Sequence, residues 1–195
     1  KILSDYLDQH DKVGVCGGNL YDADMSPASS YHYVFSPLLW DINSILSGKL
    51  FRLLYGKNYH FNHTDQPRKV AHIVGANMMM KKSIFDTLGG FDKDFFMYRE
   101  ETELNYRVYK MGYTTMSVPE AKIIHLEGKS FSCNYTRTKV MLDSRKLQYK
   151  KISNPLAYFI GNLLYDTSAL VRIGLFALKG DKEKTAFWKF ILKNT

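Results

Sequence analysis

Hydrophobic and polar positions along the chain predict an α/β region followed by a helical one. Apolar residues at helical spacing predict a helix over residues 2–10, and a short apolar run bounded by glycine predicts a buried strand over residues 13–17. The other elements expected up to residue 125 are a strand over 70–80, a helix over 84–88 capped by Ser83, a helix over 100–111, and two short strands, 114–118 and 121–125, on either side of Pro119. This alternation is typical of an α/β fold.

The pattern is helical after residue 135 and weak between residues 31 and 69. Helices are predicted over residues 136–151, 155–178 and 182–193. Residues 31–69 mix aromatic side chains with glycine and show no clean period, which is typical of an insert that is either functional or mobile. We therefore expect two regions, residues 1–135 and residues 136–195.

Composition and charge narrow the classes of partner. The chain has 195 residues, of which 45% are hydrophobic and 24% charged, so it can form one sizeable core and is not intrinsically disordered. The net charge of +8 lies entirely in residues 137–195, because residues 1–136 hold fifteen basic and fifteen acidic residues. Such asymmetry indicates an anionic partner, either a nucleic acid or a membrane surface, unless it is only a solvated basic face. Cys16 and Cys133 are too few for a disulfide framework and fit a reducing compartment.

One predicted helix is nearly long and apolar enough to span a bilayer. Residues 156–178 contain only two charged side chains, Asp166 and Arg172, and lysines flank the segment on both sides. Because the two charges disfavour a spanning helix, the main alternatives are a helix packed on the rest of the protein and an interfacial helix on anionic headgroups.

Three carboxylates fall in the first turn of the helix predicted over residues 100–111. Glu100, Glu101 and Glu103 repel one another, but the free N–H groups and the dipole of the helix N-terminus favour negative charge there. The same field is expected to lower the pKa of each carboxyl, so that all three are ionised at neutral pH. Ionised carboxylates act as bases or as cation ligands, although acidic residues also open many helices for stability alone.

A set of motifs follows a fixed order over about residues 70–131. Small and basic residues mark the end of a strand, an acidic pair opens a helix, and a histidine closes the set. The motifs are Gly75-Ala76-Asn77 with Lys81-Lys82, Gly89-Gly90-Phe91-Asp92, Phe95-Phe96, Glu100-Glu101-Thr102-Glu103, Gly112-Tyr113, Pro119-Glu120-Ala121 and His125. This ordered set resembles family 2 glycosyltransferases and is most similar to their bacterial rhamnosyltransferase-like members.

The resemblance implies a fold and a reaction. Residues 1–135 would be the C-terminal part of a GT-A catalytic domain, with a mixed sheet between helices, and residues 136–195 a basic helical region. The activity would be an inverting transfer of a sugar from a nucleotide-sugar donor to a saccharide or lipid-linked acceptor, in bacterial cell-surface polysaccharide synthesis. The implied location is cytoplasmic and peripheral to the inner face of the cell membrane.

The resemblance also assigns the acidic pair. In the family the second carboxylate is generally the base that deprotonates the acceptor hydroxyl, which maps to Glu101; Glu100 would orient the acceptor or the helix start, and is the other candidate for the base. The chain reads Glu-Glu-Thr-Glu where Glu-Asp-x-Asp is usual. The extra methylene moves the carboxylate outward, and a misplacement of about 1 Å can cost ~10²-fold in rate. This departure keeps open an alternative, a non-catalytic saccharide-binding or assembly module with the same fold.

Further site residues follow from the same resemblance. Gly75 and Asn77 are expected beneath the transferred sugar, where a small residue allows close approach and an amide can bind a hydroxyl group. His125 is expected to help hold a divalent cation, Mn²⁺ or Mg²⁺, on the donor diphosphate. Asp22-Ala23-Asp24 has the letters of a metal-binding DxD motif but follows the wrong strand, so a turn is predicted there.

The remaining expectations concern partners and completeness. No nucleic acid is expected, because the basic residues lie away from the matched motifs and show no aromatic RNA-binding signature. The chain opens at Lys1 on a helix with no cap before it, so we expect a fragment of a longer protein, with the nucleotide-binding half and the true DxD motif upstream. Such a fragment is expected to be inactive, and an unpaired sheet edge would allow it to form oligomers.

Overall fold

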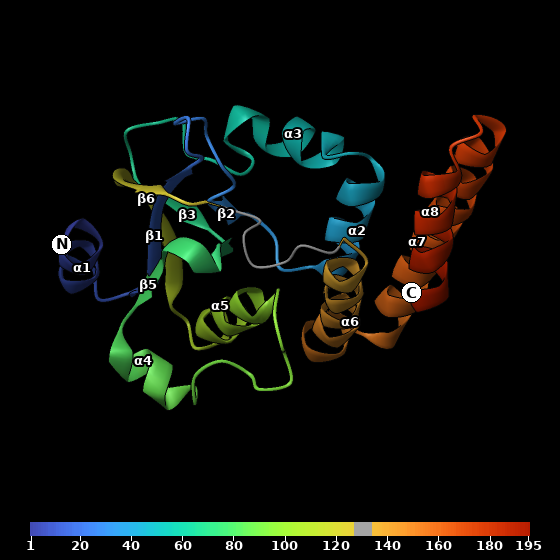
Figure 1. Cartoon of the computed structure of the whole chain (residues 1–195). Coiled ribbons are helices and arrows are strands. Elements are labelled where there is room, and N and C mark those ends of the chain that lie inside the picture. Colours follow the sequence, from blue (N-terminus) through green and yellow to red (C-terminus); the bar gives the residue numbers. More distant parts are fainter. Residues whose placement is uncertain (127–133) are drawn as a thin grey trace. The chain divides into compact units, whose positions relative to one another are not determined.

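The computed structural model describes residues 1–126 and 134–195, which form two compact units (Figure 1). The first unit consists of Lys1–Phe35, Phe51–Asp94 and Arg99–Lys129, and the second of Ser36–Leu50, Phe95–Tyr98 and Ser130–Thr195. The second unit therefore joins the C-terminal helices to two earlier segments that no sequence pattern associates with them.

A four-stranded mixed sheet forms the centre of the first unit. Its strands are β1 (Val13–Tyr21), β3 (Arg68–Val70), β5 (Met78–Met80) and β6 (Thr114–Ile124), in the order β3-β6-β1-β5. β1 pairs in parallel with β6, whereas β5 and β3 pair antiparallel at the two edges. A separate antiparallel pair joins β2 (Tyr31–His32) to β4 (His72–Ile73). The mixed sheet and its helices confirm the predicted α/β class and are consistent with part of a GT-A fold.

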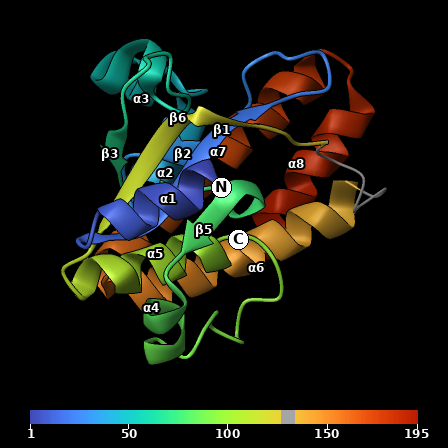
Figure 2. The ribbon, with the colours of Figure 1, turned by 90° about the vertical axis from the view of Figure 1, so that its left-hand side faces the viewer.

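Helices cover both faces of this sheet (Figure 2). α1 (Ile2–Gln9) places Leu3 and Leu7, one turn apart, against one face. On the other face, α4 (Lys82–Thr87) and α5 (Glu100–Lys110) contribute Ile84 and Val108 to a second apolar cluster. Because both faces are covered, β1 is buried along almost its whole length instead of alternating between core and solvent.

β6 runs through Pro119 as one strand, so the prediction of two short strands on either side of this proline is wrong. The register shifts at this point: Gly17 of β1 pairs with Ser117, whereas Asn19 pairs with Lys122. The extra residues of β6 bulge toward β1, and a Cβ atom on Gly18 would overlap the carbonyl group of Ala121. Glycine at position 18 therefore allows the two strands to stay paired on both sides of the bulge.

Other local predictions also differ from the structure. The apolar run over residues 70–80 does not form one strand, because a 3₁₀ turn at Gly75–Asn77 separates β4 from β5. The Ser83 cap is wrong, since Ser83 lies inside α4, which begins at Lys82. The weakly patterned residues 31–69 contain two helices and a 3₁₀ turn: α2 (Pro37–Ile45), α3 (Lys49–Tyr55) and Gly56–Asn58.

The second unit combines α2 with the three C-terminal helices. These are α6 (Asn134–Ile152), α7 (Pro155–Leu178) and α8 (Lys182–Asn194), within two residues of their predicted bounds. Pro155 occupies the first position of α7, and the Asn154 side chain accepts a hydrogen bond from the Ala157 N–H. Among the described residues, no helix has both the length and the hydropathy that crossing a membrane requires.

A buried polar network lies between the helices of the second unit. Arg145 on α6 forms an ion pair with Asp41 on α2 (Nη2 to Oδ2, 2.6 Å) and donates a hydrogen bond to Asn162 on α7. The Tyr149 hydroxyl donates to the same Asp41 oxygen (2.6 Å), and the guanidinium packs against the rings of Tyr149 and Tyr165. The network ties two C-terminal helices to a much earlier one, since Asp41 and Arg145 are 104 residues apart.

Candidate active site

α5 begins directly after two residues with unusual backbone conformations. Tyr98 and Arg99 both have a φ of +69°, in the left-handed region that residues with a Cβ atom rarely adopt. Each such residue costs roughly 1–2 kcal/mol, and strain of this kind is concentrated at functional sites. The strained residues bring Glu100 and Glu101 to the first two positions of the helix.

Glu101 is partly buried, and its carboxyl group titrates well above the usual range of a glutamate. Burial, and to a smaller extent the charge of Glu100, raise the pKa of Glu101 from 4.5 to about 7. The backbone N–H groups of Glu101 and Arg99 and the charge of Arg99 lower the pKa, but by less. The expectation that the helix N-terminus keeps this carboxyl ionised is therefore wrong, because the loss of water outweighs the helix field. A carboxyl with a pKa near 7 can take up and release a proton at neutral pH.

The 3₁₀ turn at Gly75–Asn77 brings Gly75 next to Glu101. A Cβ atom on Gly75 would lie 3.7 Å from the Cβ atom of Glu101 and 4.0 Å from its Cγ atom. Glycine therefore leaves open the space beside the Glu101 side chain, which any larger residue would begin to fill. The structure thus brings together two of the residues that the sequence singles out.

The other two carboxylates of the acidic turn have different surroundings. Glu100 Oε2 is buried, and none of the described residues forms a hydrogen bond with it. Glu103 is almost fully buried and pairs with Arg107 (2.8 Å), whose guanidinium also donates to the carbonyl groups of Leu88 and Gly90. Glu103 therefore fastens α5 to the turn that follows α4, which is a structural role.

Asn105, which no motif indicates, positions the start of α5. Its buried amide nitrogen donates to the Glu101 carbonyl (2.7 Å) and to Sδ of Met78 on β5 (3.1 Å). Its side-chain oxygen accepts a hydrogen bond from the Thr115 hydroxyl on β6 (3.2 Å). Asn105 thus links the first turn of α5 to two strands of the sheet. In the sequence it is one asparagine on a helix, with no feature that marks this role.

Asn77 is buried beside β1. Its amide nitrogen donates to the Gly18 carbonyl (2.5 Å), and its Oδ1 atom, also buried, has no hydrogen-bond partner in the part of the chain that the structure describes. The first contact holds the backbone of β1 opposite the bulge of β6. The hydrogen bond to a sugar hydroxyl that the resemblance implies for Asn77 stays a prediction.

His125 directly follows β6, and its backbone N–H donates to the Tyr21 carbonyl (2.8 Å). Within residues 1–126 and 134–195, no three His, Cys, Asp or Glu side chains lie together in a way that could hold a metal ion. Asp22 and Asp24 both accept hydrogen bonds from Ser26, which confirms the predicted turn. The described residues thus do not supply a donor set for a divalent cation, and the role of His125 as a cation ligand stays a prediction.

Two histidines, His72 buried and His32 partly buried, lie near Arg99, in a cluster that no sequence pattern indicates. The ring of His72 lies 5.0 Å from that of His32 and 6.3 Å from that of Phe35, which also packs edge-on against Tyr106 of α5 (5.4 Å). Burial lowers the pKa of His72 to about 3 and that of His32 well below its usual value, and the charge of Arg99 adds to both effects. Both imidazoles are therefore neutral near pH 7 and supply no positive charge to the site.

Known proteins with similar sequences have names that describe glycosyl transfer or polysaccharide synthesis. The chain is 26% identical over 129 residues to N-acetylglucosaminyl-diphospho-decaprenol L-rhamnosyltransferase of Mycobacterium tuberculosis, a match that covers 66% of this chain and 42% of the relative. It is 31% identical over 103 residues to the probable glycosyltransferase YdaM of Bacillus subtilis, covering 47% and 24%. The O-antigen biosynthesis protein RfbC of Myxococcus xanthus is 29% identical over 70 residues, covering 36% and 6%. The chain is related to family 2 glycosyltransferases.

This glycosyltransferase-related chain spans less than half the length of the relatives it matches. No protein-family model matches it. The relatives are named as a rhamnosyltransferase, a probable glycosyltransferase and a protein of O-antigen biosynthesis, so the resemblance that the ordered motifs indicate is confirmed.

Proposed function

We propose that the full-length protein containing this chain is an inverting glycosyltransferase of bacterial cell-surface polysaccharide synthesis. It transfers a sugar from a nucleotide-sugar donor to a hydroxyl group of a saccharide or lipid-linked acceptor, at the inner face of the cell membrane. The names of the relatives support this class of reaction. The observation that carries the proposal is the Glu101 carboxyl, whose pKa is about 7, at the start of α5.

Glu101 is the base in this proposal. Its carboxylate accepts the proton of the acceptor hydroxyl while the hydroxyl oxygen attacks the anomeric carbon of the donor. The bond from that carbon to the diphosphate breaks on the opposite face, and the nucleoside diphosphate leaves with the electron pair, so the anomeric configuration inverts. A pKa near 7 makes Glu101 a stronger base than an exposed glutamate, yet leaves about half of it ionised at neutral pH.

Neighbouring residues support this role. Gly75 leaves space beside Glu101 for the transferred sugar, and Asn105 holds the first turn of α5 against the sheet. The charge of Glu100 contributes to the raised pKa of Glu101. A divalent cation would neutralise the donor diphosphate when bound, but the described residues provide no donor set for it, so no step is assigned to His125.

Replacing Glu101 with glutamine in the full-length protein tests the proposal. Loss of a general base lowers a rate by ~10²–10⁴-fold, so we expect transfer to fall by at least ~10²-fold while donor binding is retained. Glu120→Gln, at an exposed position of β6, is the matched control and should transfer at the wild-type rate. In the wild type, the rate should rise with pH through about 7, because only ionised Glu101 accepts a proton.

The outcomes separate the alternatives. If Glu101→Gln keeps more than about a tenth of the wild-type rate, Glu101 is not the base, and Glu100→Gln becomes the variant to measure. If the full-length protein binds a saccharide but turns over no nucleotide sugar, the transfer reaction is wrong and a binding or assembly module takes its place.

A further inference from the structure

One face of α7 is apolar and exposed along the whole helix. The α7 stripe comprises seven side chains that are more than half exposed: Leu156, Phe159, Leu163, Leu170, Val171, Leu175 and Leu178. They recur at helical spacing over about 33 Å. Every exposed residue of α7 is uncharged, and the one exposed polar side chain, Thr167, donates its hydroxyl to the Leu163 carbonyl (2.7 Å). An exposed apolar face of this extent marks an interaction site.

The opposite face of α7 is already packed within the second unit. Ala169 is buried, and Tyr165 packs against Arg145 of α6. Arg172 lies over the ring of Trp188 on α8 and forms a hydrogen bond with Ser168. The α7 stripe is therefore the outer face of a helix that already has a complete inner face.

Basic residues flank the α7 stripe at both ends. Lys150 and Lys151 stand in the last turn of α6, just before α7, and Lys179 and Lys182 follow α7; all four are exposed. Residues 137–195 as a whole carry a net charge of +8. An apolar face with basic ends is the pattern of a helix that lies in the interface of an anionic bilayer.

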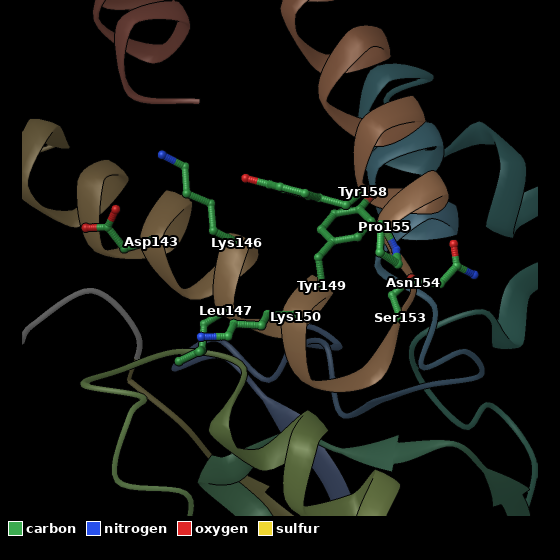
Figure 3. Close-up of a pocket in the computed structure, with 9 residues that line it drawn as sticks. All are labelled: Asp143, Lys146, Leu147, Tyr149, Lys150, Ser153, Asn154, Pro155 and Tyr158. Atoms are coloured by element: carbon green, nitrogen blue, oxygen red, sulfur yellow. The ribbon is translucent and has the colours of Figure 1, made fainter.

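A pocket of about 550 Å³ opens at the turn between α6 and α7, where the α7 stripe begins (Figure 3). Its lining is mainly apolar, but Lys146 and Lys150 add two ammonium groups. Asp143, the acidic residue of the lining, is paired with Lys139 (2.6 Å). In Figure 3, Lys146 and the hydroxyl end of Tyr158 extend over the same side of α6. Apolar walls with two cations suit the phosphate-bearing end of an amphiphile.

We propose that the α7 stripe and this pocket form a docking surface for a bilayer that contains anionic phospholipid. The stripe lies at the boundary of the acyl chains, the flanking lysines contact headgroups, and a headgroup phosphate enters the pocket near Lys146 and Lys150. A second copy of the chain is a poorer occupant, because packing two stripes together would bring two regions of +8 charge side by side. Docking does not depend on the transfer activity proposed above.

Flotation of the purified chain with lipid vesicles tests the α7 stripe. We expect binding to vesicles of phosphatidylcholine mixed with phosphatidylglycerol, little binding to phosphatidylcholine alone, and weaker binding as salt rises. The double variant Leu163→Gln, Leu170→Gln should bind at least about tenfold more weakly than the wild type, because it removes two exposed apolar side chains. The matched control Leu53→Gln, Leu54→Gln alters two exposed leucines of α3 and should bind as the wild type does.

A second pair of variants tests the pocket. Lys146→Gln, Lys150→Gln should weaken binding to anionic vesicles by about fivefold per lysine. Lys57→Gln, Lys93→Gln, at exposed positions of the first unit, is the control and should have a smaller effect. Millimolar inorganic phosphate should leave the binding unchanged; if it prevents the binding of the wild type, the pocket takes free phosphate and its assignment to a headgroup is wrong.

Circular dichroism and thermal unfolding establish that each variant is folded. Equal binding to neutral and anionic vesicles would overturn the proposal, and so would a stripe variant that binds as the wild type does. A dimer seen by light scattering that the stripe variant abolishes, together with no vesicle binding, would assign the stripe to a second copy of the chain.

Discussion

The raised pKa of Glu101 predicts a loss of stability that can be measured in this chain alone. An unperturbed glutamate has a pKa of 4.5, whereas Glu101 in the folded chain has a pKa of about 7. Between these values the folded state binds more protons than the unfolded state, so the free energy of unfolding falls as the pH rises. At about 1.4 kcal/mol per pKa unit, ionised Glu101 destabilises the folded state by about 3 kcal/mol above pH 7. Because Glu101 is partly exposed, screening by solvent brings the expected effect to ~1–3 kcal/mol.

Glu101→Gln removes this effect with almost no change in side-chain size. The variant should be more stable than the wild type by ~1–3 kcal/mol above pH 7. The difference should shrink as the pH falls toward 4.5, because the folded carboxyl is then protonated and the unfolded one increasingly so. Urea unfolding followed by circular dichroism, at one pH near each end of this range, measures the difference directly.

Two other glutamates serve as controls. Glu120→Gln, at an exposed position, should change stability little and equally at both pH values. Glu103→Gln should be less stable than the wild type at both, because it weakens the ion pair with Arg107. If Glu101→Gln is no more stable than the wild type above pH 7, burial does not dominate the titration of Glu101, and the argument for its role as base fails.

Two further substitutions test the packing of each unit. Asp41→Ala leaves the Arg145 guanidinium buried without its counter-ion, so it should lower the free energy of unfolding by ~3–5 kcal/mol in urea titrations. Asp143→Ala removes an exposed ion pair of α6 and should lower the free energy of unfolding far less. Gly18→Ala places a Cβ atom against the Ala121 carbonyl, so it should lower the free energy of unfolding by ~1–3 kcal/mol and with it the thermal midpoint. A Cβ atom at Gly174 meets nothing within 4 Å, so Gly174→Ala should not lower the midpoint.

Elements with strong local signals could be predicted from the sequence. α5, α7 and α8 have a helical period of apolar residues, and Gly112 and Pro155 mark one end of α5 and of α7. α2 and α3 were not predicted, although Ser36 at the cap and Pro37 at the first position are a sequence signal for the start of α2. β6 continues through Pro119 only because Gly18 on the neighbouring strand accommodates the bulge, which is a tertiary effect.

The candidate site shows the same division between local and tertiary information. The motifs indicate Gly75 and Glu101, and the two residues prove to be neighbours. The titration of Glu101 could not be predicted, because the sequence shows three carboxylates at a helix start but not how much water reaches each of them. Asn105 and the histidine pair were missed for a related reason, since their partners lie on other strands, which only the tertiary fold brings close.

The ion pair between Asp41 and Arg145 also sets an order of events during synthesis. The two residues are 104 positions apart, and ribosomes add ~5–20 residues per second, so α2 leaves the ribosome roughly 5–20 s before its partner on α6. The last strand of the central sheet ends at Ile124, before Arg145 has been added. The nascent chain can therefore complete its sheet while Asp41 is still hydrated, and only a chain that extends through α6 and α7 can bury this carboxylate with its counter-ion.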